Sequence, residues 1–293
     1  MSHKMYIAVP VLLWAATPLI LSKLTYGLPV SQINWLVSAL SLPVLILVNV
    51  FTGKYRELFS YNRKDYAFMF LMGIIGIFPY TALYYFAFAL SPSDAGSINI
   101  INYTWPVWVI ILSVIILKET LTWKTIAGIL LSIAGVYLIV SGNNTFKAGN
   151  MAALISAGTA AFFWGLFSIL TKYKSYEPLS SLLIYNAAAF IPFSAIVLFA
   201  GNPVSPSPED WFLLIILGSI INVLGYLFWI LALRHGNTSR VATLIYLTPF
   251  FALIYLYIFN GTKIELFQFI GLALIVSGSL IQKITKIKRG KLS

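Results

Sequence analysis

The sequence predicts an all-α integral membrane protein with ten transmembrane helices, arranged as two inverted five-helix repeats (5+5). Three observations lead to this fold class: an apolar composition, a one-sided distribution of basic residues, and an internal repeat. Hydrophobic residues make up 60% of the 293 residues, and charged residues make up 9%. Soluble domains carry roughly a quarter charged residues. The mean hydropathy of +0.90 is typical of polytopic membrane proteins.

Ten apolar runs of about 20 residues each are candidate transmembrane helices. The breaks between them carry turn and charge signals, such as Thr52-Gly53-Lys54 and Gly142-Asn143-Asn144. We interpret the first run as a span, because it is longer than the apolar region of a signal peptide. The predicted spans are residues 5–25, 31–52, 66–90, 95–117, 123–142, 149–171, 179–200, 210–233, 239–259 and 265–284.

The basic residues alternate between the two sides of the predicted membrane protein. With the N-terminus in the cytoplasm, only Lys23, Lys147 and Lys263 of the 19 Lys and Arg residues lie outside, which leaves sixteen (19 − 3) inside. This distribution follows the positive-inside rule and predicts a multi-pass protein of the inner (plasma) membrane with both termini cytoplasmic. The net charge of +11 then reflects topology and contact with anionic lipid. Membrane lipid is therefore an expected partner, and nucleic acid is not.

An internal repeat divides the chain into two halves, residues 1–144 and 145–293. Three positions recur at a constant offset of 143 residues: Pro106 with Pro249 (249 − 106), Gly128 with Gly271 (271 − 128) and Gly135 with Gly278 (278 − 135). Because each half holds an odd number of helices, the second half enters the membrane from the opposite side. Such halves are related by a pseudo-two-fold axis in the membrane plane, which is the physical basis of alternating access.

Several motifs in this repeat are similar to those of a known transporter family. They are Asn102-Tyr103-Thr104-Trp105-Pro106, Leu117-Lys118-Glu119-Thr120-Leu121-Thr122, Gly128 and Gly135-Val136 in the first half, and Thr248-Pro249, Gly271 and Gly278 in the second. Each set resembles an EamA-type half, and the whole chain resembles the drug/metabolite transporter superfamily. The Asn-Tyr-Thr-Trp-Pro motif and His235-Gly236-Asn237 are most similar to the aromatic amino acid exporter (YddG-like) branch. The second half departs from the pattern, with Asn260-Gly261-Thr262 in place of Leu117-Lys118-Glu119.

The resemblance implies a secondary transporter that exports small metabolites, namely aromatic or other neutral amino acids, by alternating access. No Asp or Glu lies in the middle of a predicted span. Proton antiport and cation efflux usually need a buried carboxylate, so both are disfavoured. We therefore expect facilitative transport of a neutral or zwitterionic solute, with no cofactor.

Two alternatives remain open at this point. One is a transporter or flippase of another polar metabolite or of a lipid-linked solute, and the other is a membrane protein with a structural or regulatory role. An enzyme is not expected, because no cluster of nucleophilic and acid–base residues is visible. The chain has no cysteine, and its two histidines, His3 and His235, lie near predicted span ends, so no metal site is expected.

Amides and aromatic residues are the candidate substrate contacts. Asn99 and Asn102 share a face of the fourth predicted span, and amides inside a membrane are costly unless paired. Asn102 is the first candidate for binding a polar substrate group, with a helix–helix hydrogen bond as the competing use. Aromatic residues would wall the cavity, or else anchor the helices at the membrane interface. The full candidate set is Asn102, Asn99, Tyr103, Trp105, Tyr246, Trp14, Trp164, Tyr84, Tyr80, Tyr226, Asn222, Trp229 and Tyr185.

Prolines and small residues have separate predicted roles. Pro106 and Pro249 are expected to form paired kinks that act as hinges or gates and line the central path. Small residues on the fifth and tenth predicted spans favour close helix packing, either as a scaffold or as a dimer surface, so that a monomer and a homodimer are both compatible with the sequence. These residues are Gly128, Ser132, Gly135, Gly271 and Gly278.

Overall fold

The computed structural model describes residues 3–118, 122–142, 148–200, 203–235, 245, 247–261 and 263–282. Every regular element in these residues is helical. The α-helices are α1 (His3–Ala15), α2 (Thr17–Gly27), α3 (Val30–Phe51), α4 (Arg63–Met72), α5 (Phe78–Leu90), α6 (Ala95–Asn102), α7 (Trp105–Ile116), α8 (Trp123–Gly142), α9 (Ala148–Tyr173), α10 (Pro178–Ala200), α11 (Pro208–Ile215), α12 (Val223–His235), α14 (Leu247–Asn260) and α15 (Leu266–Gln282). Shorter segments are η1 (Lys54–Ser60), η2 (Gly73–Ile77), η3 (Pro92–Asp94) and η4 (Ile216–Asn222).

Seven helical segments in the described residues are long and apolar enough to cross a membrane. They are Tyr6–Gly27, Val30–Phe51, Arg63–Leu90, Pro92–Ile116, Met151–Tyr173, Pro178–Phe199 and Pro208–Arg234. Shorter apolar helices, Ile126–Gly135, Thr248–Asn260 and Leu266–Gly278, stand where the fifth, ninth and tenth spans were predicted. The all-helical membrane class is therefore confirmed, and the count of ten spans stays a prediction.

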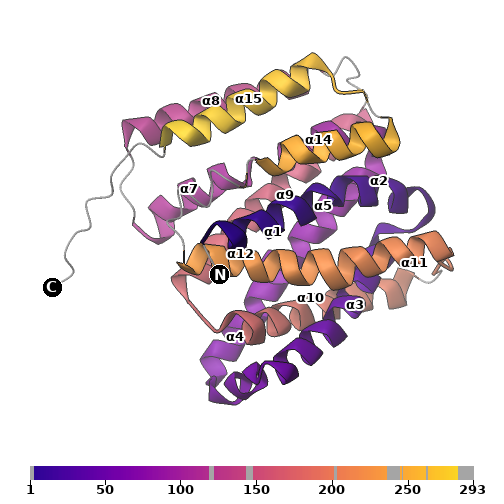
Figure 1. Ribbon diagram of the computed structural model, residues 1–293, viewed down its shortest axis with the longest axis vertical. Helices are drawn as coiled ribbons and strands as arrows, with labels where there is room; N and C mark the ends of the chain where they lie inside the picture. The colour runs from indigo at the N-terminus through magenta and orange to yellow at the C-terminus, as the bar shows by residue number, and fades with distance from the viewer. Residues whose placement is uncertain are drawn as a thin grey trace.

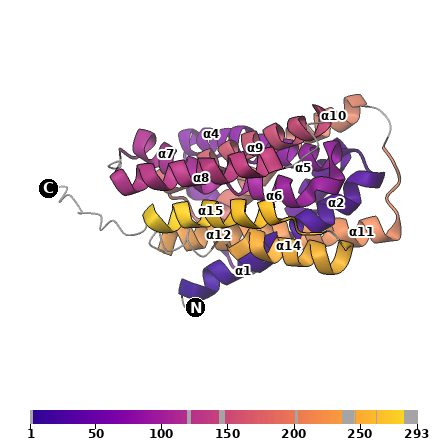
Figure 2. The same ribbon diagram turned by 90° about the horizontal axis from the view of Figure 1, so that it is seen from above.

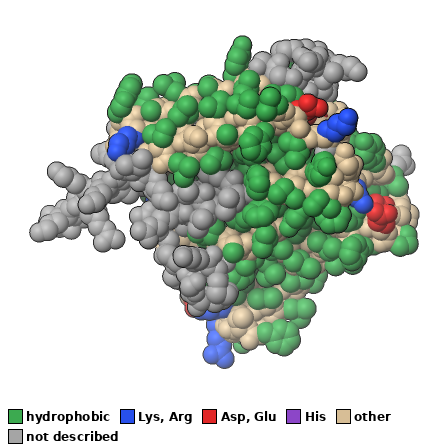
Figure 3. Space-filling model, turned by 45° about the horizontal axis from the view of Figure 1, so that its top comes forward, with side chains coloured by type: hydrophobic (Ala, Val, Ile, Leu, Met, Phe, Trp, Pro, Cys, Tyr) green, Lys and Arg blue, Asp and Glu red, His purple; other side chains and the backbone are tan. Residues whose placement is uncertain are grey.

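The helices run roughly along one direction and are stacked as a bundle (Figures 1 and 2). α8 packs along α15 at one edge of the bundle, and α5 packs on α9 in its interior. α3 packs against α10, and α1 packs against α12. The face seen in Figure 3 is mostly hydrophobic, and its visible charged side chains lie near the margins, as expected for a surface that contacts lipid.

The fourth predicted span is interrupted, whereas the sequence predicted one kinked helix. α6 ends at Asn102, and α7 begins at Trp105 with Pro106 in its first turn. A proline costs no hydrogen bond there, because the first N–H groups of a helix have no partner within it. Pro106 therefore starts a helix and does not bend one. Pro249 lies near the start of α14, and the first predicted span is similarly divided at Ala16, between α1 and α2.

Two segments of π-helix interrupt the third and eighth predicted spans. η2 begins at Gly73 and η4 begins at Ile216, so their starts are separated by 143 residues (216 − 73), the offset of the repeat. Each π-segment brings a glycine against a neighbouring backbone. A Cβ at Gly73 would overlap the carbonyl oxygen of Tyr185 on α10, and a Cβ at Gly218 would overlap that of Val37 on α3. Glycine permits both close approaches.

The small-residue faces of α8 and α15 meet each other. A Cβ at Gly135 would lie 2.5 Å from the carbonyl oxygen of Gly271 and 2.8 Å from a side-chain carbon of Ile275. Gly128, Gly135, Gly271 and Gly278 are all buried, and Ser132 lies on α8 between the first two. This geometry supports the scaffold role proposed for these glycines.

Residues of the two predicted halves contact each other at both ends of the bundle. At the end predicted to be cytoplasmic, Asp65 Oδ1 accepts a 2.9 Å hydrogen bond from the hydroxyl of Tyr176 and lies 3.9 Å from Lys174 Nζ. At the opposite end, Lys23 Nζ lies 3.4 Å from Glu209 Oε1. In each pair, one residue belongs to the predicted first half and the other to the second.

Candidate functional site

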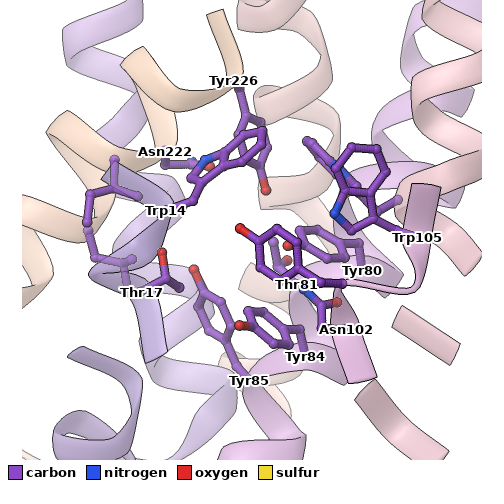
Figure 4. A pocket seen from close by; sticks show the side chains of 14 residues that line it. Trp14, Thr17, Tyr80, Thr81, Tyr84, Tyr85, Asn102, Trp105, Asn222 and Tyr226 are labelled. Carbon is purple, nitrogen blue, oxygen red and sulfur yellow. The ribbon is translucent and has the colours of Figure 1, made fainter. Parts of the chain in front are cut away.

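A cavity lies in the middle of the bundle, between helices of the two predicted halves (Figure 4). Its volume is about 30 Å³ for the centres of water molecules, which is room for roughly two or three waters. The described conformation is therefore contracted around the cavity. The lining residues are Trp14, Thr17, Tyr80, Thr81, Tyr84, Tyr85, Asn102, Tyr103, Trp105, Trp164, Leu217, Ile221, Asn222 and Tyr226.

Aromatic rings from both halves touch one another across the cavity wall. The ring of Trp164 on α9 lies 4.8 Å from that of Tyr80 on α5 and 4.8 Å from that of Tyr226 on α12, measured between centroids. Trp14 on α1 meets Trp164 edge to face at 5.6 Å. Tilted and edge-to-face pairs at these separations are the favourable geometries for aromatic rings. These contacts join the two predicted halves into one wall.

Trp229 belongs to the layer behind the wall. Its ring lies 5.0 Å from that of Trp105 and 5.9 Å from that of Trp14, and both of those residues line the cavity. The indole nitrogen of Trp229 donates a 3.3 Å hydrogen bond to Ser168 Oγ. Trp229 therefore supports the lining residues without being among them.

The two asparagines of the fourth span have different surroundings. Asn102 lines the cavity, and its Oδ1 is buried without a hydrogen-bond partner among the described residues. Asn99, one turn earlier, lies behind the lining, where its Oδ1 accepts a 3.0 Å hydrogen bond from the hydroxyl of Tyr84. The Nδ2 atom of Asn99 is likewise buried and unpaired within the described chain. An unpaired buried polar group destabilises a protein by about 1–3 kcal/mol. Helix packing alone would not account for two such groups on one helix.

Asn222 enters the wall from the second π-segment. Its Nδ2 donates to Ser41 Oγ at 2.8 Å and to Asn186 Oδ1 at 3.1 Å. Ser41 lies on α3 and Asn186 on α10, so a polar network joins three elements behind the cavity. Both networked neighbours are buried.

Besides Asn99 and Trp229, four predicted candidates lie away from the cavity lining or outside the described residues. Tyr185 is buried in the core, with its ring 5.4 Å from that of Phe167, and it does not line the cavity. Pro106 and Pro249 are buried but are also absent from the lining. Tyr246 lies outside the described residues.

The structure adds five lining residues that the sequence did not single out: Thr17, Thr81, Tyr85, Leu217 and Ile221. Thr81 and Tyr85 each follow a predicted candidate, Tyr80 or Tyr84, so the lining face of α5 is one residue wider than the predicted stripe. Thr17 begins α2 directly after the break at Ala16, across from Trp14 near the end of α1. Leu217 and Ile221 carry no polar signal, and both lie in the π-segment η4.

The cavity is polar but uncharged. None of the lining residues in the described structure is Asp, Glu, Lys, Arg or His. The described residues also contain no group of three His, Cys, Asp or Glu side chains that could hold a metal ion. The arrangement can bind a small solute by aromatic contact and by neutral hydrogen bonds, and it offers no nucleophile with an adjacent base.

Comparison with solved structures places the fold among known proteins. The chain superimposes with a TM-score of 0.74 on a protein of known crystal structure, at 18% sequence identity and with 96% of each chain covered. At this identity the likeness concerns the fold alone.

Relatives with similar sequences are named as transporters. The uncharacterized transporter YyaM of Bacillus subtilis is 29% identical, with 89% of this chain and 87% of that protein covered. The aromatic amino acid exporter YddG of Ancylobacter novellus is 24% identical, with coverages of 92% and 93%. The model of the EamA-like transporter family matches residues 2–141 and again residues 151–282. The chain therefore belongs to the EamA-like transporter family.

Proposed function

We propose that this protein is a facilitative secondary transporter that exports neutral or zwitterionic amino acids, aromatic ones among them, by alternating access. The observation that carries the proposal is the central cavity, which is uncharged and lined by aromatic rings and two amides from both predicted halves. An aromatic wall with a few neutral polar groups suits a solute that has an apolar body and a balanced charge. Relatives named aromatic amino acid exporters support the same solute class.

The uncharged wall also bears on the energy source. A proton-coupled carrier usually places a titratable carboxylate inside the membrane. In the described structure Asp65 and Asp210 occupy the first turns of α4 and α11, where each completes a capping box. Both carboxylates therefore serve as helix caps at the ends of the bundle. A solute gradient is therefore sufficient to drive transport in this proposal.

Alternating access follows from two opposed halves, which we propose are residues 1–144 and 145–293, with five spans each. Three features support this division: the two matches of the family model, the constant offset of 143 residues, and the two π-segments at that offset. The contacts at the two ends of the bundle are the natural gates. Breaking the Asp65–Tyr176 contact would open the cavity to one side, and breaking the Lys23–Glu209 contact would open it to the other.

Counterflow in proteoliposomes tests the proposal. Vesicles loaded with a high concentration of one unlabelled amino acid are diluted into a trace of the same labelled amino acid, over a panel of aromatic, aliphatic and charged amino acids. We expect transient accumulation of neutral amino acids and none of charged ones, with no requirement for a pH gradient. If only a polar metabolite outside the panel or a lipid-linked solute exchanges, the solute class is wrong. Absence of exchange with every solute would favour a structural or regulatory role.

A further inference from the structure

Asn222 has a fixed orientation in the cavity wall. An amide NH₂ group has two hydrogens, and those of Asn222 are both directed away from the cavity, to Ser41 and Asn186. Asn186 in turn donates from its own Nδ2 to the carbonyl oxygen of Leu182 at 2.9 Å, so its Oδ1 must face Asn222. A flipped Asn222 would set two amide oxygens against each other. The network therefore determines which side-chain atom of Asn222 remains without a hydrogen bond and is available to a ligand.

The atom left over is Oδ1, a hydrogen-bond acceptor. It takes part in no hydrogen bond with the described residues and is not one of their fully enclosed unpaired atoms, so it is open to the cavity that Asn222 lines. On the other predicted half, Asn102 lines the same cavity, and its Oδ1 is enclosed in this contracted conformation without a hydrogen-bond partner within the described chain. Figure 4 shows the two asparagines on different sides of the cavity.

Two hydroxyl groups of the wall are acceptors as well. Tyr84 donates its hydroxyl hydrogen to Asn99, and Thr81 donates its own to the carbonyl oxygen of Ile77 at 3.1 Å. With their single hydrogens used inside the protein, both oxygens can offer only lone pairs to a ligand. The wall thus combines several acceptors with aromatic faces and, among its described lining residues, no carboxylate.

This combination fits the donor end of a primary amine. We propose that the cavity recognises a protonated primary amino group through Asn222 Oδ1 and Asn102 Oδ1, with Ser41 and Asn186 as positioning residues for Asn222. Acceptor oxygens bind the N–H donors, and the surrounding aromatic faces attract the positive charge. The inference rests on the proposed transport function for its biological meaning, and it concerns the half of the solute that carries the amine.

Ligand binding to the purified full-length protein tests this without any need for transport. The probes are 2-phenylethylamine, its N,N,N-trimethyl derivative and 3-phenylpropionate at neutral pH, and the readout is a ligand-dependent shift of the unfolding temperature. All three probes contain a phenyl group. 2-Phenylethylamine carries a positive charge with N–H donors, its trimethyl derivative carries a positive charge without donors, and 3-phenylpropionate carries a negative carboxylate. We expect the primary amine to bind at least about tenfold more tightly than either of the others. Equal binding of the trimethyl derivative or the carboxylate, or no binding of the amine, overturns the proposal.

Variants separate positioning from folding. Asn222→Leu and Asn102→Leu should each abolish the tenfold preference for the primary amine over the trimethyl derivative. Ser41→Ala and Asn186→Leu should reduce that preference while leaving the trimethyl derivative's weak binding unchanged, and Ser41→Thr, which keeps the hydroxyl, should restore it. Asn34→Leu is the matched control, because Asn34 is a buried amide on α3 outside the cavity lining. If Asn34→Leu lowers the preference as much as Asn222→Leu, or if Ser41→Ala leaves it intact, the assigned roles are wrong.

The outcomes distinguish this inference from the transport proposal. Counterflow of neutral amino acids together with equal binding of all three probes would retain transport and remove amine recognition. Selective amine binding without any counterflow would retain the recognition site and remove the proposed function.

Discussion

Trp14 and Trp164 meet edge to face in the cavity wall, with their ring centroids 5.6 Å apart and their planes at 87°. Trp14 lies near the end of α1 in the first predicted half, and Trp164 lies within α9 in the second. The contact joins the two predicted halves at the cavity, which both residues line. The wall therefore depends on how closely the helices behind these rings approach.

Gly225 provides the space for Trp14. A Cβ at Gly225 on α12 would overlap the indole nitrogen of Trp14. We expect Gly225→Ala to displace this ring and to lower the rate of counterflow about tenfold, equivalent to roughly 1.4 kcal/mol. Gly27→Ala is the matched control, since a Cβ there meets nothing within 4 Å. Equal rates for both variants would exclude a role for the Trp14 position.

The two π-segment glycines should respond alike. We expect Gly73→Ala and Gly218→Ala each to lower the free energy of unfolding by about 1–3 kcal/mol, the usual cost of overpacking, because the new methyl group meets a backbone carbonyl that cannot move aside. Thermal unfolding in detergent measures this, with Gly158→Ala as the control, where the nearest atom is an ordinary 3.7 Å away. A stable Gly73→Ala protein would contradict the close approach of η2 to α10.

The contact between Asp65 and Tyr176 should hold one end of the bundle closed. The chain contains no cysteine, so Thr17→Cys provides a single reporter in the cavity wall. We expect Tyr176→Phe to increase labelling of that cysteine by an impermeant maleimide severalfold from the side predicted to be cytoplasmic, and Glu209→Gln to increase it from the opposite side. The labelling is compared in vesicles of both orientations. Increased labelling from the same side in both variants would exclude opposed gates.

The same contact gives an expected pH dependence. Burial, followed by the hydrogen bond to Asp65, raises the pKa of Tyr176, and burial also raises the pKa of Tyr61. The neutral phenols are thus favoured in the folded state, and their contribution is complete below the unfolded tyrosine pKa of about 10. It is lost as the pH rises beyond that value. We expect the contribution of this contact to the unfolding temperature to be independent of pH between pH 6 and 9. Above pH 10 the unfolding temperature should fall less steeply in Tyr176→Phe than in the wild type.

Packing of α8 on α15 should affect stability but not the cavity. Gly135→Val would force its side chain against Gly271 and is expected to cost about 2–3 kcal/mol of stability. The folded fraction should transport at an unchanged rate, because neither helix contributes to the lining. Leu130→Ala, on the exposed side of α8, is the control. An altered rate per folded molecule would connect this helix pair to the transport path.

The sequence predicted the membrane class, the family and most of the cavity wall, because apolar runs, basic residues and motifs are local signals. It could not predict the interruptions of the helices. α-helical spacing grouped Trp229 with Asn222 and Tyr226, but Trp229 packs on Trp105 and Trp14 behind the wall. Leu217 and Ile221 line the cavity from the π-segment η4, where a turn has one more residue than the α-helical spacing assumes. The network of Ser41 with Asn186 joins α3 and α10, a contact that no local pattern encodes.

The glycine contacts of the π-segments have a mechanical consequence. Val37 and Tyr185 stand at the same place in their helices, each seven residues after the first (37 − 30, 185 − 178). Gly218 and Gly73 rest on the backbones of these two residues. Because glycine has no side chain to interlock with the partner helix, a small translation at these contacts leaves no void. Each contact joins the two predicted halves, Gly73 of the first to Tyr185 of the second and Gly218 of the second to Val37 of the first. The halves can therefore shift against each other at these two sites by a small sliding of the paired helices.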